Sequence, residues 1–267
     1  MLDLAWYCPS EGDGRRLGTR APERPPTFEY LLRVTQAAER AGAREILVPT
    51  GAVNDSFAPD SLFAESWTTS AALATRTRSI RLIVALNPAG ISAALAAHQA
   101  ETLEQLAPGR IAINLVAGGG PEDGYGHEPL EHGARYRRLE ALAVALRARF
   151  TGPLYLGGAS ADAKDLAARV VDTYLMWGEP PEQIAERVAE MRQLAGRPMR
   201  FGLRIHIIAR RSEREAREAA ADLLCDAQVQ DDRADEYAGF DSVGQGRMNA
   251  IPADADAWVA PGLWAGI

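Results

Sequence analysis

Phe201-Gly202-Leu203-Arg204-Ile205-His206-Ile207-Ile208-Ala209 is a stretch in which polar and apolar side chains alternate. A period of two is typical of a β-strand, whose successive side chains point to opposite faces, so Arg204 and His206 share one face. We expect a layer of helices to cover the other face, which consists of Leu203, Ile205 and Ile207. A cation beside a titratable imidazole suits a site that holds an anion next to a proton carrier. Buried polar residues can also pair simply to satisfy one another.

The rest of the chain alternates strand-like and helical patterns. The strand-like runs are 2–8, 45–49, 80–86, 111–117, 154–157, 173–177 and 200–209. The helical patterns are 28–41, 62–74, 92–106, 134–149, 161–170, 181–194 and 213–227. Because parallel strands need crossover helices, this alternation predicts either an open doubly wound sheet or a closed (β/α)8 barrel.

The residues at the strand ends favour the barrel. An open sheet usually has a glycine-rich turn such as GxGxxG after its first strand, and the sequence has none there. Polar and glycine residues instead follow nearly every strand, as in a TIM (β/α)8 barrel, whose site is built from the loops at the carboxyl ends. We therefore predict one α/β barrel domain over 1–267. Seven strands leave two unpaired edges, so we expect the eighth to come from a missing part of the chain or from another chain.

Composition restricts the classes of partner. The formal net charge of -7 provides no basic footprint for nucleic acid, and no apolar run approaches the ~20 residues that cross a bilayer. The first residues lack the features of a secretory signal, and the two cysteines, Cys8 and Cys225, have no CxxC spacing. We expect a cytoplasmic protein that binds small molecules or other subunits, without a metal site, nucleic acid or membrane.

A series of short motifs follows the order found in one protein family. The motifs are Trp6-Tyr-Cys-Pro-Ser-Glu-Gly-Asp-Gly14, Leu17-Gly-Thr19, Leu47-Val-Pro-Thr-Gly51, 82–86, 98–106, Gly109-Arg110, 114–118, 132–136, 157–160, 177–182, Arg204-Ile-His206, 241–245 and Leu263-Trp-Ala-Gly266. In this order they resemble the flavin-dependent alkanesulfonate monooxygenases of the bacterial luciferase-like family. The resemblance implies a TIM barrel that receives reduced FMN from a separate flavin reductase and uses O2 to cleave the carbon–sulfur bond of a small alkanesulfonate. The products would be an aldehyde and sulfite, and the assembly a homodimer or homotetramer.

The chain departs from the family pattern at four places. The family has an insertion after the helix that ends near Phe150, and it continues beyond Gly266 with a lid, a last strand and a helix. We therefore expect the domain to be incomplete near 150–151 and at its C-terminus. The loop 52–65 lacks a cysteine found in some members, and Glu11 replaces a frequent histidine. These last two changes leave the substrate open.

Two predicted helix starts can receive a phosphate. His132 and Tyr136 stand four apart at the start of a helix, so they share one face near the free amides of the first turn. Gly158, Ala159 and Ser160 follow a strand and open the next helix. A capping histidine and an ordinary glycine turn are the structural alternatives. The resemblance favours binding of the FMN phosphate.

Candidates for the flavin ring follow the third and fourth strands. Asn114 and Val116 share one face of the fourth strand, and Gly118 ends it, where a flat ring can approach closely. Asn114 can hydrogen-bond the polar edge of an isoalloxazine, and so can Asn87 after the third strand. Either asparagine can instead be a buried amide paired with a neighbouring strand.

The resemblance gives the last three candidates catalytic roles. Trp177 would shield a flavin peroxide from water, Arg204 would contact the sulfonate or the peroxide anion, and His206 would manage the proton. Trp177 can also be an ordinary core residue. Two other functions stay open: a flavin or deazaflavin oxidoreductase acting on a non-sulfonate substrate, and a flavin-binding protein without catalysis.

Overall fold

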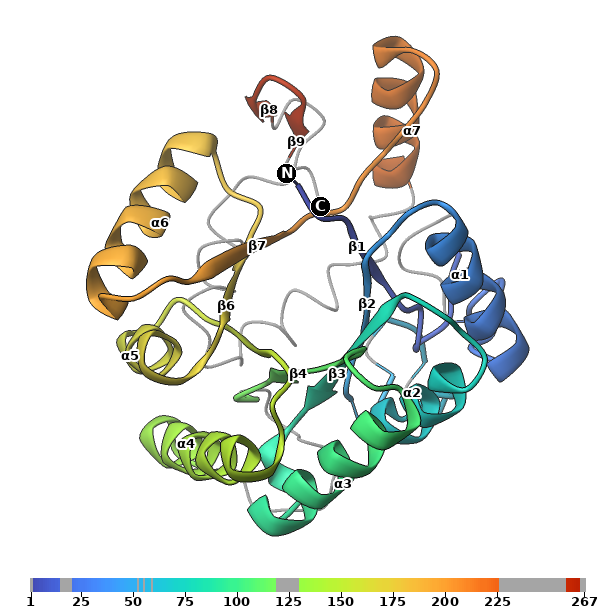
Figure 1. Ribbon diagram of the computed structural model, residues 1–267. Helices are drawn as coiled ribbons and strands as arrows, with labels where there is room; N and C mark the ends of the chain where they lie inside the picture. Colours follow the sequence, from blue (N-terminus) through green and yellow to red (C-terminus); the bar gives the residue numbers. More distant parts are fainter. Residues whose placement is uncertain are drawn as a thin grey trace.

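The computed structural model describes residues 2–14, 21–51, 53–54, 56–58, 60–118, 130–225 and 258–264. Its centre is a sheet of seven strands in sequence order, each paired in parallel with the next. The strands are β1 (Ala5–Tyr7), β2 (Glu45–Val48), β3 (Arg81–Leu86), β4 (Ile111–Leu115), β5 (Leu154–Gly157), β6 (Thr173–Trp177) and β7 (Arg200–Arg204). The helices lie outside the curved sheet (Figure 1), as a (β/α) barrel requires.

The helices occupy the predicted intervals, with shifted ends. They are α1 (Phe28–Arg40), α2 (Ser66–Ala74), the 3₁₀ turn η1 (Pro88–Gly90), α3 (Ala93–Leu106), α4 (His132–Arg149), α5 (Ala161–Val170), α6 (Pro181–Ala195) and α7 (Glu213–Cys225). Hydroxyl caps fix three starts, because Thr27, Ser92 and Ser160 each accept a bond from the amide three residues later. Helix α2 begins four residues later than predicted, since the Glu65 carboxylate caps it by accepting from the amides of residues 67 and 68.

The core lies mainly between the strands and the helices. On β3 and β4, alternate side chains face the helices and are at most 2 % exposed; they are Leu82, Val84, Leu86, Ile111, Ile113 and Leu115. The residues between them face the inside of the barrel, where Ile83, Ala112 and Tyr155 pack together. Each fully buried aliphatic side chain contributes about 2 kcal/mol of hydrophobic stabilisation. The middle of β3 and β4 is therefore apolar on both faces.

The sheet ends at β1 on one side and β7 on the other, with no pairing between them in the described residues. The prediction of a barrel short of one strand is confirmed. The prediction that helices cover the apolar face of β7 is wrong for the described chain, because Leu203, Ile205 and Ile207 are 47 %, 46 % and 65 % exposed. Strand β7 also stops at Arg204 instead of 209, since its neighbour β6 ends at Trp177, the register partner of Arg204.

A small antiparallel pair, β8 (Trp258–Ala260) and β9 (Leu263–Trp264), stands apart from the main sheet. The guanidinium of Arg217 on α7 lies 3.9 Å from the centre of the Trp258 ring. The family-like motifs at 17–19 and 241–245 lie outside the described residues. The single domain over 1–267 and the interruption near 150–151 remain predictions. Within the described segments, no helix has both the length and the apolar character needed to span a membrane.

A carboxylate on α1 holds the turn that leads into β3, which gives a prediction about stability. Glu39 accepts bonds from the amides of Arg78, Ser79 and Ile80 and from the Ser79 hydroxyl. Burial alone would raise the pKa of Glu39, but these four bonds outweigh it and lower the pKa to about 2. The ionised form therefore stabilises the fold above pH 4.5, and this contribution is lost as the pH falls towards 2.

We expect Glu39→Gln to lower the free energy of unfolding by about 1–2 kcal/mol at pH 7, a value reduced for solvent screening of a partly exposed group. The difference from wild type should shrink at pH 3, because the wild-type carboxylate is then losing its advantage. Urea denaturation at the two pH values measures this. A difference that does not change with pH would contradict the assignment.

Candidate active site

The polar candidates gather at one edge of the sheet, where the carboxyl ends of the parallel strands meet. Asn87 follows β3, Gly118 follows β4, Gly158 follows β5, Trp177 ends β6 and Arg204 ends β7. This is the edge at which barrels of this type place their sites. Figure 1 shows these strands side by side inside the helices.

The starts of α4 and α5 form one polar corner. The rings of His132 and Tyr136 are 4.9 Å apart between centroids, and the hydroxyl of Ser160 lies 3.4 Å from that of Tyr136. His132 Nε2 is 3.3 Å from Asp162 Oδ2 in the first turn of α5. Two helix amino termini, each with free amides and a positive dipole end, thus converge on residues predicted separately. The arrangement can receive an anion such as a phosphate.

Gly158 gives this corner its shape. Its φ of +141° lies in a region that side chains rarely adopt, and a Cβ here would come within 2.7 Å of the Ala163 Cβ. The hydroxyl of Tyr174 donates to the Gly158 carbonyl and holds the turn. Only glycine fits this position without distortion.

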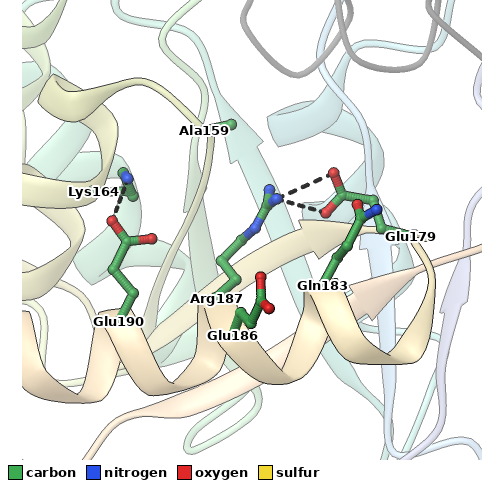
Figure 2. A pocket seen from close by; sticks show the side chains of 7 residues that line it. All are labelled: Ala159, Lys164, Glu179, Gln183, Glu186, Arg187 and Glu190. Carbon is green, nitrogen blue, oxygen red and sulfur yellow. Dashed lines mark hydrogen bonds and ion pairs between the residues drawn. The ribbon is translucent and has the colours of Figure 1, made fainter.

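Ala159 borders a separate cavity of about 550 Å³ between α5 and α6 (Figure 2). Its other lining residues are Lys164, Glu179, Gln183, Glu186, Arg187 and Glu190. Ion pairs join Lys164 to Glu190 and Arg187 to Glu179 across it, the second at 2.8 Å. The two cations that line this cavity are therefore both paired with carboxylates of the same cavity.

Asn114 is a buried amide on the inner face of β4, with 9 % exposure. Its Oδ1 has no hydrogen-bond partner among the described residues. An unpaired buried carbonyl costs about 1–3 kcal/mol, so a ligand N–H that reached it would be strongly favoured. The amide edge of a flavin ring offers such a donor.

Gly118 and Asn87 lie close to each other beyond the carboxyl ends of β4 and β3. Gly118 has a φ of +74°, and a Cβ there would lie 3.5 Å from Nδ2 of Asn87. The Oδ1 of Asn87 caps η1 by accepting from the Ala89 amide at 2.9 Å, so this oxygen has a structural role. Val116 donates its amide to the Leu86 carbonyl at 2.9 Å, which ties the end of β4 to β3.

The remaining candidates, Trp177, Arg204 and His206, lie at the mouth of the barrel beside β6 and β7. Trp177 is 36 % exposed, and the Gly178 amide donates to the Arg204 carbonyl at 3.0 Å. The Arg204 guanidinium lies over the ring of Tyr7 on β1, 4.8 Å from its centroid. Partial burial lowers the pKa of His206, and the charge of Arg204 lowers it further, although much of the residue stays accessible. Both effects favour the neutral imidazole, the form that can accept a proton.

A family model described as luciferase-like monooxygenase matches residues 2–153 and 127–262. The chain belongs to the luciferase-like monooxygenase family. The (β/α) architecture and the strand-end site agree with this assignment. The family does not by itself decide between an alkanesulfonate and another substrate.

Solved structures of several enzymes share the fold of this luciferase-like chain. A riboflavin lyase with modified FMN and riboflavin has a TM-score of 0.74 at 17 % identity, covering 95 % of this chain and 72 % of its own. A long-chain alkane monooxygenase has a TM-score of 0.71 at 15 % identity, and the match covers 99 % of this chain and 76 % of the monooxygenase. An EDTA monooxygenase from Chelativorans sp. BNC1 has a TM-score of 0.69 at 18 % identity, and the match covers 83 % of this chain and 68 % of the EDTA monooxygenase. At these identities the likeness shows the barrel fold.

Sequence reasoning on this luciferase-like chain missed two groups that the structure brings together. The sequence patterns identify Tyr7 only as part of a motif. The alternation of side chains along the first strand could have indicated that Tyr7 points inward. At the opposite end of the strands, Glu45 pairs with Arg81 at 2.8 Å and accepts from the Tyr155 hydroxyl at 2.8 Å. Burial first, and then the Glu45 charge and hydrogen bond, raise the pKa of Tyr155 to about 12. This cluster lies at the amino-terminal ends of β2 and β3, at the floor of the barrel.

The polar corner gives a direct prediction. We expect Gly158→Ala to weaken FMN binding at least tenfold, because the turn between β5 and α5 must move to relieve the contact with Ala163. Fluorescence quenching of oxidised FMN on titration with protein measures the affinity.

Gly196→Ala is the matched control, since Gly196 also has a positive φ but lies at the end of α6, where an added Cβ would meet open space. The control should lose about 1 kcal/mol of stability and bind FMN normally. Equal affinities for all three proteins would contradict the assignment.

Proposed function

We propose that this luciferase-like protein is a two-component monooxygenase that uses reduced FMN and O2 to cleave the carbon–sulfur bond of a small alkanesulfonate. The observation that carries the proposal is Arg204, a guanidinium at the mouth of the barrel with no carboxylate within 4.0 Å among the described residues. Its forked donors match the oxygens of a sulfonate. His206, the proposed proton acceptor, stands two residues away.

The residues present fit an FMN. The unpaired Oδ1 of Asn114 and the close approach allowed at Gly118 suit the ring, and the corner of His132, Tyr136 and Ser160 suits the phosphate. When bound, reduced FMN supplies the electrons that allow O2 to deliver one oxygen atom to the substrate and the other to water. The family membership supports this cofactor, and a separate flavin reductase would provide it in reduced form.

The side chains around the ring divide the remaining work. Arg204 binds and orients the sulfonate, and Trp177 limits access of water to the reacting atoms. The carbon beside sulfur loses one hydrogen as it becomes an aldehyde, and the imidazole of His206 takes the proton released there. The balance is RCH2SO3⁻ + FMNH2 + O2 giving RCHO + HSO3⁻ + FMN + H2O. A cytoplasmic homodimer or homotetramer is part of the same proposal.

One observation favours a second candidate, a flavin or deazaflavin oxidoreductase of the same family with a non-sulfonate substrate. Glu11 accepts a bond from the Ser56 hydroxyl, and its charge raises the pKa of Tyr7, after the larger effect of burial. An anion on this side of the mouth repels a second anion, so it disfavours a sulfonate that reaches that far.

Sulfite release decides between the two candidates. A panel of short alkanesulfonates is supplied with FMN, NADH and a flavin reductase in air, and sulfite is measured with a thiol reagent. Sulfite that depends on both reduced flavin and oxygen supports desulfonation. Tight FMN binding without sulfite from any sulfonate would overturn it and favour the second candidate.

A further inference from the structure

Tyr7 has no role in the proposed reaction so far, yet the guanidinium of Arg204 lies over its ring, 4.8 Å from the centroid. We propose that Tyr7 is a positioning residue, whose ring on β1 holds the guanidinium of Arg204 on β7 in place to bind the anionic group of the substrate. The anion is a sulfonate or a group of similar charge and shape, so the inference rests on the proposed function and deepens it. The contact joins the first and last strands of the sheet, which share no hydrogen bonds in the described residues.

The geometry of the pair is that of a cation stacked on an aromatic face. Arg204 Cζ lies 4.8 Å from the Tyr7 centroid, inside the ~6 Å at which this interaction is significant. The backbone of Arg204 is fixed as well, because it is paired with Trp177 and its carbonyl accepts from Gly178. The backbone contacts hold Arg204 in place, and the stack on Tyr7 holds its guanidinium group.

A second contact holds the same two strands at their other end. Arg200 Nη2 lies 2.9 Å from Asp3 Oδ2, and Asp3 Oδ1 lies 3.2 Å from Arg44 Nε. Asp3 and Arg200 stand four residues before Tyr7 and Arg204, respectively. Side chains thus join the two strand edges at both ends. The ion pair of Asp3 with Arg200 helps to set the distance between β1 and β7, independently of the stack of Tyr7 on Arg204.

An aromatic partner suits a guanidinium that must bind an anion. A carboxylate would neutralise the charge and occupy the donors, whereas a ring face holds the flat side of the group and leaves its N–H groups free at the edge. Within the described segments, no aspartate or glutamate lies within salt-bridge distance of Arg204. Burial raises the pKa of Tyr7 even though Arg204 opposes it, so the ring stays neutral at pH 7.

The test compares Tyr7→Leu, which removes the ring, with Tyr7→Phe, which keeps it. In the sulfite assay we expect Tyr7→Leu to raise KM for the sulfonate about tenfold with kcat within about twofold, because the guanidinium is less often in its binding position. Tyr7→Phe should keep both constants within about twofold of wild type. A fall in kcat alone, or an equal loss in Tyr7→Phe, would overturn the positioning role.

A second measurement on the full chain does not depend on turnover. In ¹H–¹⁵N spectra, the Arg204 Nε–H resonance should show an upfield ring-current shift in the wild type and Tyr7→Phe that is absent in Tyr7→Leu. Titration with methanesulfonate should move this resonance, with affinity about tenfold weaker in Tyr7→Leu. No ring-current shift, or equal affinity in all three proteins, would overturn the inference.

The sulfite assay separates this inference from the proposed function. If the wild type releases no sulfite but its Arg204 resonance responds to methanesulfonate as expected, desulfonation fails and the positioning role of Tyr7 stands. If the wild-type resonance does not respond at all, the anion role of the pair is overturned. Normal folding of Tyr7→Leu is checked by its urea midpoint, and Tyr7→Trp supplies a larger ring if leucine is not tolerated.

Discussion

Arg204→Ala is expected to reduce sulfite release from the best alkanesulfonate by about 100-fold in kcat/KM. The substitution removes the forked, charge-assisted contact with the sulfonate, a type of contact whose loss costs ~2–5 kcal/mol when it is shielded from water. A 100-fold loss corresponds to ~2.7 kcal/mol. Steady-state kinetics with a coupled flavin reductase measure it.

Two further variants make this prediction specific. Arg204→Lys keeps the charge but not the planar fork or the stack on Tyr7, so we expect about a tenfold loss. Arg214→Ala is the matched control, since this arginine lies on the exposed side of α7 in an ion pair with Glu218. Its kinetics should match wild type. An Arg204→Ala protein with full activity would remove Arg204 from the substrate site.

The predictable part of the fold is the part in which local signals and burial agree. The intervals of β5 and α5 were predicted to the residue, because Leu154 and Leu156 are fully buried and Ser160 caps the following helix. His132 with Tyr136, and Ser160, were predicted separately as two helix starts, and they come together because such starts meet at one edge of a barrel. The role of this corner in binding a phosphate stays a prediction.

The parts that sequence patterns missed depend on neighbours distant in the chain. The strand count predicted a missing strand, but no local signal shows where β7 ends or that Ile205 is exposed among the described residues, so the length of β7 and the covering of Ile205 were predicted wrongly. The stack of Tyr7 on Arg204 depends on the curvature that brings the two sheet edges together. The same is true of Glu45, which appears in the sequence as an ordinary charged residue before an apolar run but is 6 % exposed in the barrel.

Glu45→Ala is expected to cause the largest loss of stability among these variants, about 2–3 kcal/mol in the free energy of unfolding. It leaves the guanidinium of Arg81 without its ion pair and the hydroxyl of Tyr155 without its acceptor, both at the floor of the barrel. Breaking a buried pair typically costs 3–5 kcal/mol. The lower value is expected because the Arg81 side chain is 31 % exposed and water can reach part of it. Urea denaturation at pH 7 measures the change.

A double variant shows whether the cost comes from the unpaired charge or from lost packing. Glu45→Met alone should destabilise as much as alanine or more, since it also leaves Arg81 unpaired, whereas Glu45→Met with Arg81→Met removes both charges and should recover at least half of the loss. FMN affinity should stay at the wild-type value in every variant that folds, because the cluster lies at the amino-terminal ends of β2 and β3, opposite the candidate site. A weakened FMN affinity in a stable double variant would mean that the floor takes part in binding. Additive losses would mean that packing, and not the ion pair, makes Glu45 necessary.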